Sequence, residues 1–330
     1  LSGTYPALDY RITGNLTILS GDTVSLLAGT KFLFDGEYHF NIYGTLKAIG
    51  TEPDSIIFDN IEDNDERWKG FTLVNVSDET EFRYVRISGA EKDDGGGMFL
   101  IASDPILSHI TISGNTAEDG GGMYIGESVP ILSHITISGN TANYGGGMFI
   151  DLSNPILTNV NISGNTAEWA GGGMIIYSSN PTLNNVAITN NNAMGGGALF
   201  VWYSDPILSH ITISGNTAEL DGGALFIHSS DPILSHITIS GNTANYGGGM
   251  FLRSSDPILT NFIVWDNSPQ SIYFWEENNP STISIQYSDI EGGEEGIITN
   301  DNGEVYWLEG NINTDPLFTD PENGDYTLPK

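Results

Sequence analysis

The chain has 330 residues, and its 42 acidic and 10 basic residues give a formal net charge of −32. A field of this sign repels nucleic acid and anionic membrane surfaces, so we expect no nucleic-acid partner. The absence of cysteine excludes disulfide bonds and thiolate chemistry. No run of about 20 apolar residues occurs, so we expect no transmembrane segment.

The first 90 residues are rich in strand patterns but follow no strict repeat. Stretches such as "LTILSGDTVSLLAGTKFLF" alternate apolar and polar residues, which predicts β-strands. Eight of the ten basic residues lie in residues 1 to 92, so this end differs chemically from the rest. We interpret residues 1–90 as divergent N-terminal coils and a cap of the array that follows.

Residues 91 to 270 repeat with a period of 25 or 26 residues. Each unit has one proline: Pro105, Pro130, Pro155, Pro181, Pro206, Pro232 and Pro257. An asparagine stands ten residues after each proline: Asn115, Asn140, Asn165, Asn191, Asn216, Asn242 and Asn267. Both residue types keep their place in every unit, so the period is a real structural repeat.

Each unit contains two predicted strands. In "HITIS", Ile110 and Ile112 fall on one face and Thr111 and Ser113 on the other, which is typical of a strand with an apolar inner face. A second short strand follows the glycines, as in "GGGMFI" at 145–150. The 26-residue units carry their extra residue between the asparagine and the glycines, so we expect that segment to be a loop.

Strands that stack coil upon coil, about 4.8 Å apart, form a parallel β-helix. Identical residues then form ladders: we expect the asparagines to bond to one another and the glycines to permit left-handed backbone or close chain approach. The leucine-rich repeat is the alternative fold, because Leu107, Ile110, Ile112 and Asn115 fit its spacing. That fold needs a helix in each unit, and "AEDGGGMYI" is poor helix material, so we predict the β-helix.

Residues 271 to 330 leave the repeat and end in "NINTDPLFTDPENGDYTL", which we interpret as C-terminal coils and a cap. This tail and the N-terminal stretches resemble secreted bacterial proteins of the right-handed parallel β-helix class. The units, with Ile-x-x-Asn followed by GGGM or GGAL, resemble the FxxN and GGA[ILV] repeats of polymorphic outer-membrane proteins, which are surface adhesins. Ile112 stands where that family has phenylalanine. The resemblance implies one all-β, right-handed parallel β-helix domain over residues 1–330, located outside the cell or on a bacterial surface.

Aromatic residues near the glycines indicate a binding face. Such rings at coil spacing can stack on successive sugars or support a protein partner. Three units carry a glutamate in this variable segment, 13 residues after their proline: Glu118, Glu168 and Glu219. The candidate face for a glycan or partner consists of Tyr144, Trp169, Tyr246, Tyr177, Trp202, Glu118 and Glu168.

We interpret the chain as a non-catalytic extracellular or cell-surface module for adhesion, glycan binding or assembly, because the coils are nearly identical. We assign no catalytic residue. Its expected partners are a polysaccharide, a cell-surface glycan, a protein or a second copy of the chain. One alternative is a polysaccharide lyase or glycoside hydrolase, using a cation such as Lys69, Arg83 or Arg86, or the pair Glu118 and Glu168. Another is an ice-binding protein that uses outward Thr and Ser ladders.

Two residue sets bear on metals. His109 and His134 should stack on adjacent coils, as should His210 and His236, either as a hydrogen-bonding ladder with asparagines or as a metal site. Acidic residues before the prolines, together with the negative field, make Ca²⁺ the one cofactor that suits the chain: Asp104, Asp205, Asp231 and Asp256. No Ca²⁺-binding motif occurs, so we expect no resident cofactor.

Overall fold

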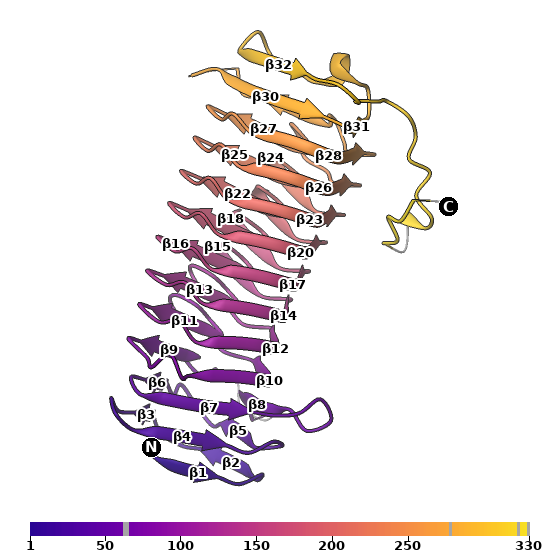
Figure 1. Ribbon diagram of the computed structural model, residues 1–330. Helices are drawn as coiled ribbons and strands as arrows, with labels where there is room; N and C mark the ends of the chain where they lie inside the picture. The colour runs from indigo at the N-terminus through magenta and orange to yellow at the C-terminus, as the bar shows by residue number, and fades with distance from the viewer. Residues whose placement is uncertain (62–65, 277–278, 322–323, 329–330) are drawn as a thin grey trace.

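The computed structural model describes residues 1–61, 66–276, 279–321 and 324–328. The chain winds into a rod of about 12 turns with about 25 residues per turn (Figure 1). No α-helix occurs in these ranges, and the one complete 3₁₀ turn in them is Glu294–Gly296, so the predicted parallel β-helix is confirmed and the leucine-rich repeat is wrong. The described part of the chain has no long apolar helix of the kind that crosses a membrane.

The longest strands form one side of the rod and pair in parallel, in register, from coil to coil. Each bends at its fourth residue, His109 and its equivalents, where φ lies between 52° and 57°. The alternation in "HITIS" predicted the strand from the bend onwards. It did not show that the strand already begins three residues before the bend. These strands are β10 (Glu81–Ser88), β12 (Ile106–Ser113), β14 (Ile131–Ser138), β17 (Ile156–Ser163), β20 (Thr182–Thr189), β23 (Ile207–Ser214), β26 (Ile233–Ser240) and β28 (Ile258–Trp265).

A second parallel sheet contains the short strands that follow the glycines, as predicted. Its members are β3 (Leu16–Ile18), β6 (Phe40–Ile42), β9 (Phe71–Val74), β11 (Met98–Ile101), β13 (Met123–Gly126), β16 (Met148–Asp151), β19 (Met174–Tyr177), β22 (Leu199–Trp202), β25 (Leu225–His228), β27 (Met250–Arg253) and β29 (Ile272–Phe274).

A third sheet occupies the segment that we expected to be a loop. It consists of β15 (Thr141–Tyr144), β18 (Thr166–Ala170), β21 (Asn192–Gly195) and β24 (Thr217–Asp221). The loop prediction is wrong because stacked coils pair their backbone groups even where the side chains are polar and exposed. The extra residue is absorbed as a register shift, for example between Ala142 and Tyr144.

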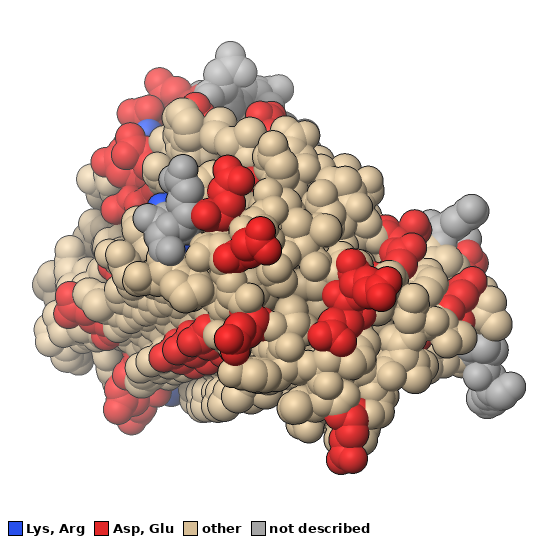
Figure 2. Space-filling model, turned by 90° about the horizontal axis from the view of Figure 1, so that it is seen from above, with Lys and Arg blue, Asp and Glu red and all other residues tan. Residues whose placement is uncertain are grey.

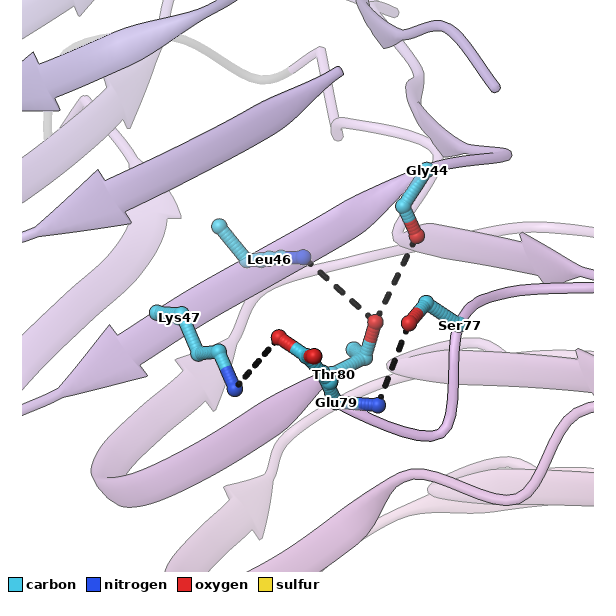
Figure 3. Close-up of polar contacts among 6 residues, drawn as sticks. All are labelled: Gly44, Leu46, Lys47, Ser77, Glu79 and Thr80. Carbon is cyan, nitrogen blue, oxygen red and sulfur yellow. Dashed lines mark hydrogen bonds and ion pairs between the residues drawn. The ribbon is translucent and has the colours of Figure 1, made fainter. Parts of the chain in front are cut away.

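The divergent coils at both ends continue the first sheet. At the N-terminal end these are β1 (Gly3–Tyr5), β2 (Asp9–Ile12), β4 (Thr23–Leu26), β5 (Lys31–Phe34), β7 (Thr45–Ile49) and β8 (Ile56–Asn60), and at the C-terminal end β30 (Ser281–Gln286), β31 (Asp289–Ile290) and β32 (Gly303–Trp307). Figure 3 shows the contacts that join β7 to the coil of β10. The buried Thr80 hydroxyl contacts Gly44 O and Leu46 N at 3.4 Å each, and Lys47 pairs with Glu79 at 3.7 Å.

The chain after β32 runs back along the side of the rod (Figure 1). It ends in a short hairpin in which Asp320 and Asp325 pair through their backbones. Tyr326 of this hairpin and Ser214 and Ser240 of the first sheet line one hollow. Both serines are buried, at 6% and 2% exposure. We call residues 313–321 and 324–328 the tail.

Buried asparagines form the expected ladder along the rod. The amide of Asn165 donates to Asn191 Oδ1 at 3.0 Å and to Ile137 O at 3.0 Å, and its oxygen accepts from the amide of Asn140 at 2.9 Å. The same pattern links the asparagines from Asn115 to Asn267. A serine ladder, which the sequence did not suggest, runs parallel to it: the backbone N–H of Ser128 donates to Ser153 Oγ at 2.9 Å.

Glycine is required where successive coils meet. A Cβ on Gly146 would lie 2.5 Å from Gly172 O, and one on Gly147 would lie 2.5 Å from Gly173 O. Both contacts are with backbone, which cannot move without separating the coils. By contrast, a Cβ on Gly139 would meet nothing within 4 Å, although its φ of 62° disfavours other residues.

We predict that Gly146→Ala lowers the free energy of unfolding by at least about 3 kcal/mol, because the new methyl group overlaps a carbonyl of the next coil. Gly139→Ala is the matched control and should cost only about 1 kcal/mol of backbone strain. Urea denaturation of both variants measures the difference. Equal destabilisation would contradict the close approach of the coils.

Candidate functional site

A groove of about 410 Å³ opens where the third sheet meets the outer face of the second sheet. Its side chains come from four successive coils. We call it the aromatic groove, and its lining is Glu118, Asp119, Asn143, Tyr144, Phe149, Ala170, Ile175, Tyr177, Phe200 and Trp202.

The hollow exists because one coil breaks a ladder of rings. On the outer face of the second sheet, Tyr124 stacks on Phe149 at 5.4 Å and Phe200 on Phe226 at 4.5 Å. Ile175 lies between these two stacks, in register with Phe149 and Phe200, and has no ring. Ala170, at the end of β18, also lines the groove and has a still smaller side chain. The floor of the groove therefore drops between Phe149 and Phe200.

Tyr177 and Trp202 form one end of the groove. Their ring centroids lie 5.2 Å apart, and Trp202 also stacks on Tyr203 at 5.3 Å and on His228 at 5.7 Å. These contacts hold the indole in place. Its Nε1 is buried and has no hydrogen-bond partner among the described residues.

Carboxylates lie at the other end. Burial, followed by the charges of Asp94, Glu118 and Asp151, raises the pKa of Asp119 to about 6. Asp151 accepts a hydrogen bond from Tyr124 Oη at 3.0 Å, and burial together with this contact raises the pKa of Tyr124. Figure 2 shows that acidic side chains also outnumber basic ones on the face seen from above.

The structure divides the seven candidate residues into two groups. Four line the aromatic groove: Glu118, Tyr144, Tyr177 and Trp202. The other three are exposed outside it: Glu168, Trp169 at 44% and Tyr246 at 47%. Tyr246 lies against Tyr273 at 5.2 Å.

The candidate face drawn from the sequence did not include four residues that line the groove: Asp119, Asn143, Phe149 and Phe200. The available signal was the single Ile175 in a series of aromatic residues. It marks the coil where the ladder of rings opens.

The residues of the enzyme alternative are dispersed. Lys69 pairs with Glu37 at 3.1 Å and Arg83 with Glu81 at 3.6 Å, so both cations have local acidic partners. Arg86 is exposed on β10. Of the carboxylate pair, only Glu118 lines the groove.

The histidines stack as predicted: His109 on His134 at 4.6 Å, and His210 on His236 at 4.8 Å. Asparagines extend these stacks, since the Asn159 amide lies 3.1 Å from His134 Nε2. No group of three or more His, Asp or Glu side chains in the described ranges is placed to hold a metal ion.

The acidic row before the prolines has a structural function. Asp205 Oδ1 accepts the backbone N–H of Asp231 at 2.7 Å, and Asp231 Oδ1 accepts that of Asp256 at 2.8 Å. Each carboxylate thus bonds to the next coil.

We predict that Asp119→Asn changes stability in a pH-dependent way. The folded protein binds the Asp119 proton more tightly than the unfolded chain, so this group favours folding at low pH. That advantage is lost as pH rises from the ordinary pKa of 3.8 to about 6. Above pH 6 the variant should be more stable than the wild type by about 1 kcal/mol, after allowance for partial exposure. At pH 3.5 the difference should disappear.

Urea denaturation at pH 3.5 and pH 7.5 measures both values. Glu168→Gln, which removes one charge from an exposed position, corrects for the change in net charge. If the stability difference between Asp119→Asn and the wild type is the same at both pH values, the pKa of Asp119 is not raised in the folded protein.

Comparison with known proteins identifies the family. The solved structure of GH136 lacto-N-biosidase from Eubacterium ramulus aligns over 90% of this chain and 63% of its own, with 11% identity and a TM-score of 0.37. The catalytic unit of thermostable GH87 alpha-1,3-glucanase from Streptomyces thermodiastaticus strain HF3-3 aligns over 94% and 63%, with 13% identity and a TM-score of 0.32. The chain thus spans less than two thirds of either protein. No curated protein sequence matches it. The family model described as "Right handed beta helix region" matches residues 69–201 and 158–312, well over half of the sequence, so the chain belongs to the right-handed β-helix family.

Proposed function

We propose that the protein is a non-catalytic glycan-binding module that holds a neutral or amino-bearing oligosaccharide in the aromatic groove. The observation that carries this proposal is the convergence of Tyr144, Tyr177 and Trp202 on one groove that Phe149 and Phe200 also line. Coils repeat about every 4.8 Å, a spacing comparable to the length of one hexose unit in a chain. Successive sugars can therefore meet successive coils.

The groove offers the two kinds of contact that a sugar needs. Aromatic rings pack against the apolar face of a pyranose, and Tyr144 is 43% exposed for this purpose. At the rim, Glu118 accepts hydrogen bonds from hydroxyl groups, and the Asn143 amide both donates and accepts.

The charge of the groove and of the whole chain restricts the class of oligosaccharide that can bind. No lysine or arginine belongs to the described lining of the groove, and the whole chain carries −32. A polyuronate would be repelled by this field. The ligand is therefore a neutral or amino-bearing oligosaccharide.

The arrangement of the carboxylates favours binding over hydrolysis. Glycoside hydrolysis requires two carboxyl groups that flank the scissile bond, about 5 to 10 Å apart. Glu118 and Asp119 are consecutive residues on one wall of the groove, and the opposite end carries Tyr177 and Trp202. A bound sugar would meet both acids on the same side.

The module would act outside the cell, on a bacterial surface or in its surroundings, where glycans are accessible. The Ile-x-x-Asn and GGGM repeats, which resemble those of surface adhesins, support an adhesive role. Binding in one lateral groove leaves both ends of the rod free.

We predict that Tyr144→Ala and Trp202→Ala each weaken binding about tenfold, equivalent to about 1.4 kcal/mol, because each removes one stacking ring. A glycan array with neutral, amino-bearing and uronate oligosaccharides identifies the ligand, and titration calorimetry on the best neutral or amino-bearing one measures the affinities.

Tyr246→Ala is the matched control, since Tyr246 occupies the same repeat position as Tyr144 but lies outside the groove. Its affinity should remain within twofold of the wild type. Failure of every neutral and amino-bearing glycan to bind at millimolar concentration would refute the proposal. Equal losses of affinity for Tyr144→Ala and Tyr246→Ala would show that the aromatic groove is not the binding site.

A further inference from the structure

A second hollow, of about 420 Å³, lies on the outer face of the long strands β14, β17, β20 and β23. We call it the amide trough, and the side chains that matter for its chemistry are His134, Thr136, Asn159, Asn161, Asn185 and Ala187. It shares no lining residue with the aromatic groove.

The amide trough exists because two adjacent coils depart from the repeat. Where neighbouring coils have "HITIS", these two have "NVNIS" and "NVAIT". Ala187 pairs in register with Thr212 on one side and Asn161 on the other, and its short side chain lowers the floor. The stacked imidazole pairs that end in His134 and begin with His210 form the two ends.

The amides are only partly used within the protein. Asn185 Nδ2 donates to Asn159 Oδ1 at 2.5 Å, and Asn159 Nδ2 lies 3.1 Å from His134 Nε2. The side-chain amide of Asn161 has no hydrogen bond to any described residue, and Asn161 is exposed. The trough thus presents unused donors and acceptors to solvent.

The tail extends this hollow. A further depression of about 720 Å³ shares Ala187 and Thr212 with the amide trough, and Tyr326 of the tail forms part of its wall. Phe318 contacts Tyr326 edge to face at 5.1 Å and supports that ring. The surface is therefore continuous from His134 to an aromatic side chain.

The lining is free of formal charge. None of the described residues of the amide trough is Lys, Arg, Asp or Glu, although the chain carries −32. A charged ligand would find no counter-charge there, whereas amides, imidazoles and hydroxyls match the hydroxyl groups of a neutral sugar. We propose that the amide trough is a second binding site, separate from the aromatic groove, for an uncharged oligosaccharide chain.

The test starts from the Tyr144→Ala/Trp202→Ala protein, in which the aromatic groove is impaired. The probes are uncharged hexasaccharides of glucose, mannose and N-acetylglucosamine, measured by titration calorimetry. At least one of them should bind this protein with one site per chain. Adding Ala187→Tyr, which fills the trough, should weaken that binding at least tenfold.

Thr111→Tyr is the matched control, because Thr111 occupies the same repeat position on the same face, outside the trough. It should leave the affinity within twofold. Asn161→Ala removes the exposed amide without adding bulk to the trough, so it should also weaken binding severalfold. Absence of binding by the groove-impaired protein, or equal affinities for the Ala187→Tyr and Thr111→Tyr variants, would overturn this second site. Either result would leave the first site untouched if the wild type binds and Tyr144→Ala weakens it.

Discussion

The close approach of successive coils at the glycines and buried asparagines is the constraint on which the rest of the structure depends. The Asn165 amide bonds to the coils on both sides of it, and a Cβ on Gly147 would lie only 3.1 Å from its Nδ2. Neither residue type can change without separating the coils or leaving a buried amide unpaired. In the first and second sheets this constraint keeps the repeat coils in register with one another, so equivalent positions align into ladders.

Because equivalent residues stack on one another, a single different residue in one coil changes the shape of the surface. One residue without a ring, Ile175, opens the aromatic groove, and one residue with a short side chain, Ala187, lowers the floor of the amide trough. Both hollows thus arise where a ladder is interrupted. The positions that hold the fold together remain constant, while recognition is assigned to positions that vary. This separation explains how nearly identical coils can carry a distinct site.

The sequence predicted those features that recur at the same position in every repeat unit. The strands, the asparagine ladder and the stacking of His109 on His134 follow from period and alternation, because a parallel β-helix places equivalent residues one above another. It did not predict the third sheet, because the short, polar and exposed segments that form it lack the apolar alternation that marks the other strands. It also did not reveal that the first residue of each long strand, such as Ile106, faces outward at 49% exposure, because the bend at His109 changes the direction of the strand.

The candidate site could be predicted only in part, because the repeat shows which residues vary but not which of them lie close together. Tyr144 and Trp202 stood out as aromatic residues at variable positions, and so did Trp169 and Tyr246. Which of them share a groove depends on the angle between the second and third sheets and on the size of neighbours such as Ala170. A one-dimensional pattern contains neither quantity.

The most direct test of the central claim, that interrupted ladders create the binding sites, is a crystal structure with a bound neutral oligosaccharide. We expect a sugar ring packed against Tyr144 or Trp202 in the aromatic groove. An oligosaccharide bound only to uninterrupted coils, with the groove empty, would contradict it.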